Sequence, residues 1–204
     1  MPDLHRALSD IGDIRQQLAA GTLFRGFGPL VVAITGVLAL LTALAQSLVP
    51  ALAQTPRAFL LTWSCTAVLA VLLIGVEMVA RTRRQHGGLA DAMLFNAVEH
   101  FLPVGLAGAT ITAILYEFAP DTTWLLPGLW QLLLALGLFA ATRFLPRRVA
   151  IAGAWYFVAG AAVLMLSSQD RTLLPWAMGI PFAVGQLLLA AIIRTAYGEE
   201  DGQL

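Results

Sequence analysis

The sequence predicts an all-α polytopic membrane protein, with six transmembrane helices in a single membrane domain of 204 residues. Composition is the first reason: 59% of the residues are hydrophobic and only 12% are charged, with a mean hydropathy of +0.80. A soluble domain is roughly half apolar and about a quarter charged, so this chain has too few polar residues to cover a surface that faces water. The second reason is a series of apolar segments close to the ~20 residues that cross a bilayer.

Six segments have the length and apolar character of a membrane-spanning helix. They cover residues 28–49, 59–80, 97–119, 123–145, 149–168 and 173–196. Prolines, glycines and charged residues separate them, as turns and helix boundaries require. The third segment begins with polar residues, so a tilted or re-entrant path also fits it.

Residues 1–27 precede the first span, and residues 197–204 follow the last. Within the first part, residues 3–19 place apolar side chains at i, i+3, i+4 and i+7, with charged side chains opposite. This spacing predicts a short amphipathic helix. It is expected to lie on the inner membrane surface, to dock on its own bundle, or to bind a cytoplasmic protein partner.

The arginine distribution predicts the orientation. Ten of the twelve basic residues lie in the N-terminal arm, around the loops after the second and fourth spans, and at the end of the sixth. Only Arg57 and Arg171 fall on the other side. Both termini are therefore expected in the cytoplasm. All basic residues are arginine, which we interpret as typical of a GC-rich bacterial genome and hence of a bacterial inner (cytoplasmic) membrane. The net charge of zero gives no indication of nucleic-acid binding.

The main candidate site is a group of polar residues where the second and third spans meet. Glu77 lies one turn before Arg81, and Glu99 and His100 lie near the start of the third span, so an antiparallel hairpin would place them at one depth. Asn96 is four residues before His100 and shares its helix face. The connecting turn and the helical lead-in add two secondary candidates, His86 and Asp91.

Two prolines are expected to kink their helices, Pro103 in the third span and Pro181 in the sixth. Proline has no N–H, so the carbonyls of Glu99 and Ala177 lose the donor that normally lies four residues further on. Helices broken in this way are tolerated where they line a cavity or a packed interior. The freed carbonyls are therefore expected beside other polar groups.

The fourth and sixth spans share a short pattern, LLPGLWQLLLA and LLPWAMGIPFAVGQLLLA. Each begins Leu-Leu-Pro and carries a glutamine before Leu-Leu-Leu-Ala, and these glutamines, Gln131 and Gln186, are secondary site candidates. The pattern suggests a helical hairpin repeated in parallel orientation, as in some small transporters. Chance alignment of two leucine-rich helices explains it equally well.

The group formed by Glu77, Glu99 and His100 has three interpretations. The carboxylates can pair with the neighbouring arginines and simply tie two helices together. They can form a proton or ion site, since ionisable groups near a span often serve one. The same three side chains also suit Zn, Mn or Fe, or a haem. The sequence itself requires no cofactor.

Small residues spaced along three spans would let helices approach closely, within the bundle or between copies in a homo-oligomer. These pairs are Gly105 with Ala109, Gly137 with Ala141, and Gly153 with Gly160. The five tryptophans lie mostly near the ends of the spans, where interfacial anchors are expected.

Four stretches together resemble a group of uncharacterised bacterial inner-membrane proteins of about this length. They are FRGFGP (24–29), EMVARTRRQHGGLADAM (77–93), VEHFLPVGLAGA (98–109) and LPGLWQ (126–131). The likeness extends over nearly the whole chain. It implies a six-helix membrane protein and no particular activity, so it assigns a role to no residue.

The sequence favours a small transporter or an ion- or proton-conducting protein. No zincin, Walker, C-x-x-C or G-x-S-x-G motif is present, and the segments outside the spans are short, so we expect neither catalytic residues nor an enzyme with a soluble catalytic face. The alternatives are a membrane scaffold or sensor subunit that binds a cytoplasmic partner through residues 1–27, and a metal- or haem-binding membrane protein.

Overall fold

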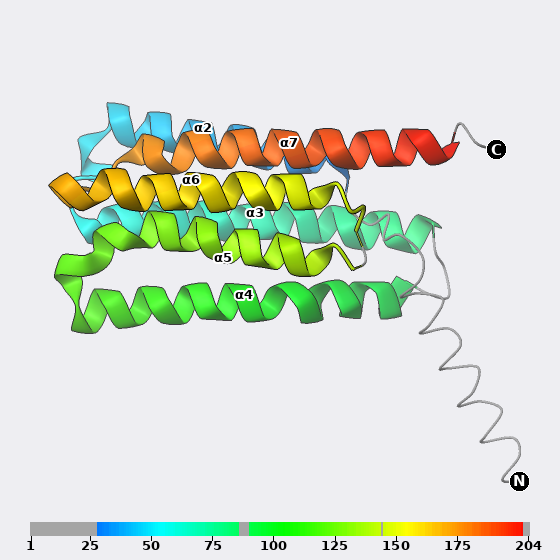
Figure 1. Cartoon of the computed structure of the whole chain (residues 1–204), viewed down its shortest axis with the longest axis horizontal. Helices are drawn as coiled ribbons and strands as arrows, with labels where there is room; N and C mark the ends of the chain where they lie inside the picture. Colours follow the sequence, from blue (N-terminus) through cyan, green and yellow to red (C-terminus); the bar gives the residue numbers. More distant parts are fainter. Residues whose placement is uncertain (1–27, 86–89, 144, 202–204) are drawn as a thin grey trace, which may run out of the picture.

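The computed structural model describes residues 28–85, 90–143 and 145–201; within these ranges, the side chains of residues 81–98, 100 and 197–201 are not described. The described residues form an all-α bundle without strands. Six of its helices are long and apolar enough to cross a membrane (Figure 1). The predicted arm of residues 1–27 and the candidate His86 lie outside the described residues.

The bundle consists of six long helices and two short 3-10 helices. In chain order they are α2 (Pro29–Leu48), η1 (Pro50–Leu52), α3 (Pro56–Gln85), α4 (Ala90–Phe118), η3 (Pro120–Leu125), α5 (Leu126–Ala141), α6 (Val149–Asp170) and α7 (Pro175–Asp201).

Prolines mark where several elements begin. Pro29, Pro56 and Pro175 are the first residues of α2, α3 and α7, and Pro120 is the first residue of η3. Proline is favoured in the first turn because the N–H that it lacks would have no partner there. At the end of α6, Arg171 adopts the left-handed conformation with φ of 52° and closes the helix.

The ends of four helices, α3, α4, α5 and α7, differ from the prediction by more than two residues. The apolar span of α3 ends at Ala80 and that of α4 begins at Phe101, yet both helices continue through the polar residues beyond. Arginine and glutamine are good helix formers, so loss of apolar character does not end a helix. α5, in contrast, ends at Ala141 rather than at residue 145. A helix continued through Pro146 would lose the hydrogen bond to the Thr142 carbonyl and would press the proline ring against it.

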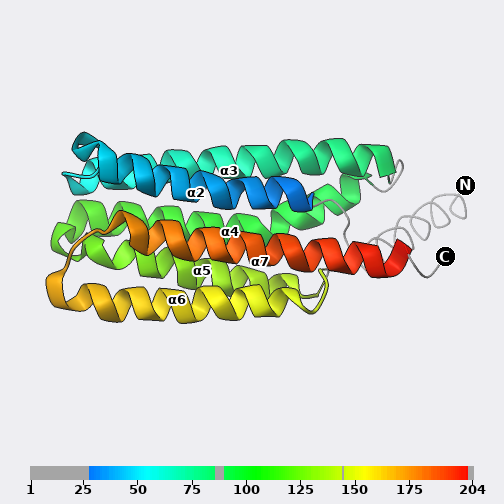
Figure 2. The ribbon, with the colours of Figure 1, turned by 90° about the horizontal axis from the view of Figure 1, so that it is seen from above.

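Two helix pairs make the most extensive contacts in the bundle, α2 with α7 and α5 with α6. α3 lies along one edge in Figure 2, and α4 lies along one edge in Figure 1. No residue from Phe101 to Phe118 in α4 is buried, whereas α5 and α7 bury much of their spans. α4 is therefore a peripheral helix whose apolar side chains face the lipid.

Glycines let the helices of these two pairs approach each other closely. A Cβ on Gly128 would come within 2.8 Å of the Gly160 carbonyl, so α5 and α6 cross backbone to backbone. A Cβ on Gly36 would meet the Ala183 carbonyl at 3.1 Å, which holds α2 close to α7. At Gly105, no other helix among the described residues comes within 4 Å of an added Cβ, so a close approach there between copies of the chain stays a prediction.

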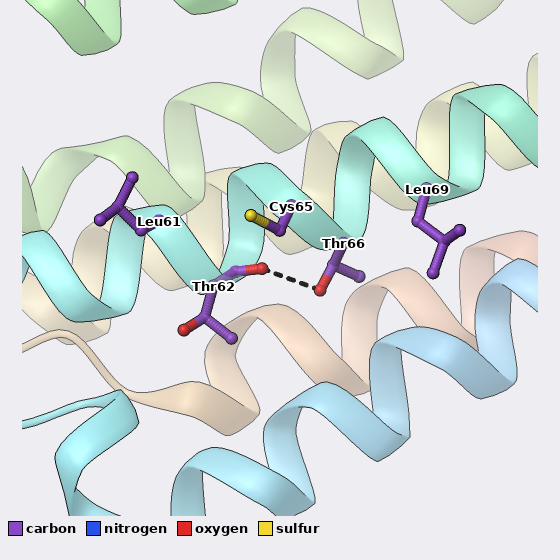
Figure 3. Close-up of a pocket in the computed structure, with 5 residues that line it drawn as sticks. All are labelled: Leu61, Thr62, Cys65, Thr66 and Leu69. Atoms are coloured by element: carbon purple, nitrogen blue, oxygen red, sulfur yellow. Dashed lines mark hydrogen bonds between the residues drawn. The ribbon is translucent and has the colours of Figure 1, made fainter.

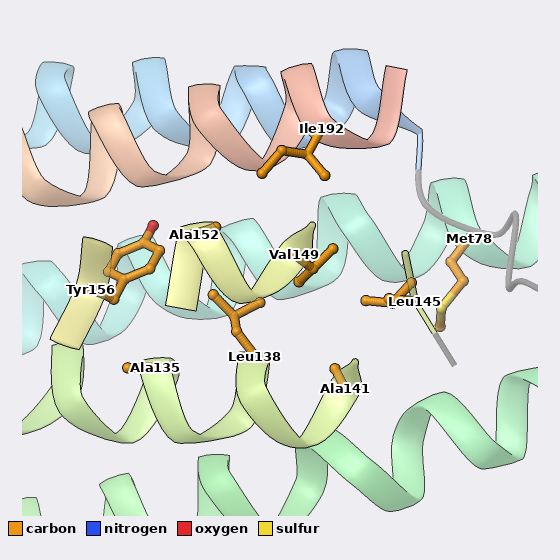
Figure 4. Close-up of a cluster of buried hydrophobic side chains, with 9 residues drawn as sticks. All are labelled: Met78, Ala135, Leu138, Ala141, Leu145, Val149, Ala152, Tyr156 and Ile192. Carbon is orange, nitrogen blue, oxygen red and sulfur yellow. The ribbon is translucent and has the colours of Figure 1, made fainter. Parts of the chain in front are cut away.

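The buried apolar side chains form clusters along the bundle. One lies mainly between α5 and α6, with contributions from α3 and α7 (Figure 4). A second joins α2, α3, α5 and α7, and a third, smaller one joins α2 to α7 through Val32, Ala190 and Ile193. Many large apolar side chains remain exposed on the outside, as expected where lipid is the solvent.

Candidate functional site

The polar cluster predicted between the second and third spans is described only in part. Glu77 is half-buried at the end of the α3 span, and its carboxylate lies against the start of α2: a Cβ on Gly28 would be 2.7 Å from Glu77 Oε1. Glu99 is exposed and precedes the apolar span of α4. Asp91, Asn96 and His100 belong to α4, but their side chains lie outside the description. Convergence of Glu77, Glu99 and His100 stays a prediction.

The metal interpretation of that cluster has no support among the described residues. They contain no group of three or more His, Cys, Asp or Glu side chains that could hold a metal ion. The imidazole of His100, which the predicted set requires, is not described. The predicted metal or haem site is therefore untested.

A different polar site lies at the proline in α7. Pro181 lies inside the helix and cannot donate to the Ala177 carbonyl. Gln131 of α5 supplies the missing donor, with Nε2 at 2.9 Å from the Ala177 oxygen. The sequence predicted that the Ala177 carbonyl would lack its helical donor, and it gave Gln131 as a candidate site residue. It did not predict that Gln131 would donate to this carbonyl.

Two aromatic residues of α6 extend this network along α7. Trp155 Nε1 donates to the Pro181 carbonyl at 2.9 Å, and the Tyr156 hydroxyl donates to the Phe182 carbonyl at 3.3 Å. Tyr156 is fully buried, and Figure 4 shows its hydroxyl directed toward α7. Its ring packs against Gly185, where a Cβ would approach Tyr156 Cζ to 2.3 Å. Side chains of α5 and α6 therefore bind three carbonyls of α7, those of Ala177, Pro181 and Phe182. α7 is continuous here, and the α7 break means only the helical hydrogen bond that Pro181 removes.

Two buried oxygens at this site have no hydrogen-bond partner among the described residues, Gln131 Oε1 and Gln186 Oε1. Gln131 is fully buried, and the Gln186 carboxamide lies beside the Tyr156 hydroxyl. A buried acceptor without a donor costs about 1–3 kcal/mol. Both open positions are acceptors, so the site lacks hydrogen-bond donors.

The interior around this site is polar but uncharged. Every polar side chain that is buried in the described part of the chain is neutral: Thr35, Thr42, Gln46, Thr123, Gln131 and Ser167. Charged residues are confined to the ends of the helices and to partly or fully exposed positions. Electrostatically, the site consists of fixed dipoles without a net charge.

Other polar side chains in the bundle join neighbouring helices. Trp63 Nε1 donates to Gln46 Oε1 at 2.8 Å across α2 and α3, and Trp130 Nε1 donates to Thr112 Oγ1 at 2.9 Å across α4 and α5. With the Trp155 bond between α6 and α7, one indole N–H bond joins each of the hairpins α2–α3, α4–α5 and α6–α7. These three tryptophans therefore tie helices together, in addition to any anchoring at the membrane surface that their positions suggested.

A shallow apolar hollow of about 410 Å³ lies on the outside of the bundle. The residues that line it all belong to α3 (Figure 3): Leu61, Thr62, Cys65, Thr66 and Leu69. The threonine hydroxyls are occupied, since Thr66 donates to the Thr62 carbonyl at 2.9 Å and Thr62 to the Ala58 carbonyl at 2.8 Å. The hollow is open and apolar, so it presents a surface to lipid rather than a polar binding site.

Sequence reasoning missed Trp155 and Tyr156 as site residues. Aromatic residues are common in membrane spans, so nothing in their sequence context distinguished the two. The signal available for Gln131 and Gln186, a polar side chain inside an apolar span, is stronger because such residues need a partner there.

Comparison of the chain with protein-family models, with curated proteins and with solved structures gives no match. The functional argument therefore comes from the geometry of the chain alone.

Proposed function

We propose that this chain is a small membrane transporter and that its solute path passes the break in α7 at Pro181. One observation supports this best: Gln131 is fully buried, donates to the carbonyl that Pro181 frees, and keeps its own Oε1 open. A leucine would fill the same space without an unsatisfied oxygen. Polar residues that violate local rules inside a span mark functional positions by default.

The position of the break agrees with transport. Transporters commonly bind their substrates where a helix leaves backbone groups without helical partners; α7 is continuous, and Pro181 leaves the Ala177 carbonyl in that state. In α7, Gln186 lies at the middle of the span Pro175–Ala196, and Pro181 lies between Gln186 and the η3 end. The open acceptors therefore extend from one side of the bundle toward its centre.

In this proposal, the polar cluster at the opposite end serves as the entrance to the path. Glu77, Asn96, Glu99 and His100 would attract polar solutes or protons to the mouth of the α3–α4 hairpin. Replacing Glu99 with glutamine is then expected to lower the flux through the protein while leaving its folding intact, since Glu99 is exposed.

Flux into proteoliposomes tests the proposal. Purified protein is reconstituted, and the entry of protons, Na⁺, K⁺ and small uncharged solutes is recorded against protein-free vesicles. Gln131→Met is expected to reduce whichever flux the protein carries, and the exposed Gln54→Met serves as the control. Rates equal to those of protein-free vesicles for every solute would refute transport.

A second function, a membrane scaffold, is favoured by the length of α3 and α4. Both helices continue beyond their apolar spans at the arginine-rich end (Figure 1), which is a suitable shape for docking a partner. Deletion of residues 1–20 would then remove a co-purifying protein, while Gln131→Met would leave that association unchanged. Retention of the partner by the deletion variant would exclude this mode of binding.

A further inference from the structure

The open acceptors at the α7 break indicate what kind of molecule the site takes. Gln131 Oε1 and Gln186 Oε1 each lack a donor, and the Ala177, Pro181 and Phe182 carbonyls already accept from protein side chains. A carbonyl oxygen has two lone pairs. The Pro181 and Phe182 carbonyls lie inside α7 and also accept from N–H groups four residues further on, so both of their lone pairs are used. The Ala177 carbonyl has no helical donor and can accept once more. The open positions of the site are therefore the Ala177 carbonyl, Gln131 Oε1 and Gln186 Oε1, and each needs an N–H or O–H donor.

The surroundings exclude a charged ligand on energetic grounds. A desolvated ion needs a counter-charge, or enough oxygens to replace its hydration shell, as in the carbonyl rings of ion-selective filters. The buried polar side chains of the described residues are all neutral. The carboxylate of Glu77 is engaged at the start of α2, against Gly28. The site could not compensate an ion for the loss of its hydration shell. An uncharged molecule with N–H groups loses less on entering and gains hydrogen bonds there.

Aromatic rings next to these acceptors favour a flat molecule. The rings of Tyr156 and Phe182 are 5.4 Å apart, centroid to centroid, at 61°. The Trp155 indole lies beside the same turn of α7 through its bond to the Pro181 carbonyl. Planar amide-like groups pack well on aromatic faces while their N–H groups reach neighbouring oxygens.

We propose that the α5–α6–α7 crossing at Pro181 binds small, uncharged, amide-like solutes, of the class of urea, through donation to Gln131 Oε1 and the Ala177 carbonyl, with Gln186 Oε1 as a separate acceptor further along α7. This inference rests on the proposed transport function and specifies its substrate class. The solute forms no covalent bond, and the site selects it by donor groups and by neutrality.

Stopped-flow light scattering of proteoliposomes tests this inference, with urea as the probe, glycerol as a non-planar donor and Na⁺ and proton fluxes recorded in parallel. The wild-type protein is expected to raise urea permeability at least tenfold over protein-free vesicles, and glycerol permeability less. Gln131→Met and, separately, Gln186→Met are expected to remove most of the urea effect. Gln54→Met, which changes an exposed glutamine, is expected to leave it unchanged.

The two variants guard against misfolding because they change different contacts: Gln131 bridges α5 and α7, whereas the Gln186 carboxamide lies beside the Tyr156 hydroxyl. Each variant is compared with the wild type by gel filtration in detergent. Ion flux without urea flux would overturn the inference and leave transport standing. Water permeation with urea excluded would also overturn it, since the open oxygens then hold water only. No flux of any kind would refute both proposals.

Discussion

At the scale of single residues, two buried glutamines, Gln46 and Gln131, differ in how completely they are hydrogen-bonded. Gln46 is satisfied: Oε1 accepts from Trp63 at 2.8 Å, and Nε2 donates to the Leu52 carbonyl at 2.9 Å. Gln131 makes one bond and leaves its oxygen open. The first arrangement stabilises a helix pair, whereas the second leaves an open acceptor, which our proposal assigns to a ligand.

Gln46→Leu is expected to destabilise the protein by about 1–3 kcal/mol, because the buried Trp63 N–H loses its acceptor. Unfolding of the detergent-solubilised protein by a denaturing detergent would measure this. The exposed Gln54→Leu is the matched control. Adding Trp63→Phe to Gln46→Leu should cost less than the sum of the two single changes, since neither polar partner then remains; additive costs would contradict the bond.

The residue scale also shows what the sequence could predict. The loss of a donor at Ala177 follows from Pro181 by counting four residues, and the structure agrees. The replacement donor comes from Gln131, which lies 46 residues earlier in the chain. No local sequence pattern predicts the contact between Gln131 and Ala177, because the contact depends on how α5 packs against α7.

At the scale of elements, the six spans were predictable and their ends were not. Apolar length alone identifies the helices, since a bilayer fixes how many apolar residues a span needs. The extension of α3 to Gln85 was missed because the apolar pattern ends at Ala80 while the helix does not. The start of α5 was missed because residues Pro120–Leu125 form a 3-10 helix, which the same pattern cannot distinguish.

The crossing of α5 and α6 gives a prediction at this scale. Gly160→Ala is expected to cost about 1–3 kcal/mol, because its Cβ would lie 2.9 Å from the Gly128 carbonyl, which cannot move aside easily. Gly105→Ala is the matched control: open space surrounds it, and alanine is the better helix former, so stability should stay equal or rise. Equal losses in thermal unfolding of the two variants would contradict the crossing.

At the scale of the whole molecule, an even number of spans places both chain ends on one side. Six helices of the described chain are long and apolar enough to span, and the sequence distribution of the arginines predicts that ten of the twelve lie on that side. Reporter fusions to residues 1 and 204 should therefore give the same signal, that of the cytoplasm. Opposite signals from the two fusions would require one span to be wrong.

The membrane depth of α3 can be measured with the single cysteine. Cys65 is exposed at the middle of the α3 span, so a spin label on it should be relaxed by oxygen, which concentrates in lipid, and hardly by a water-soluble nickel chelate. In a Cys65→Ser background, Gln169→Cys at the exposed end of α6 should show the reverse. Strong relaxation of the Cys65 label by the nickel chelate would place α3 in water.

The tryptophan bonds have a consequence for the order in which the bundle is built. Their partners are 17, 18 and 26 residues apart, each within one hairpin, so each pair can be joined soon after the ribosome delivers its second helix. The bond between Gln131 and Ala177 spans 46 residues and needs the last hairpin. The proposed amide-binding position can therefore form only after α7 has been made, and a nascent chain halted before α7 would hold only the tryptophan bonds of α2–α3 and α4–α5.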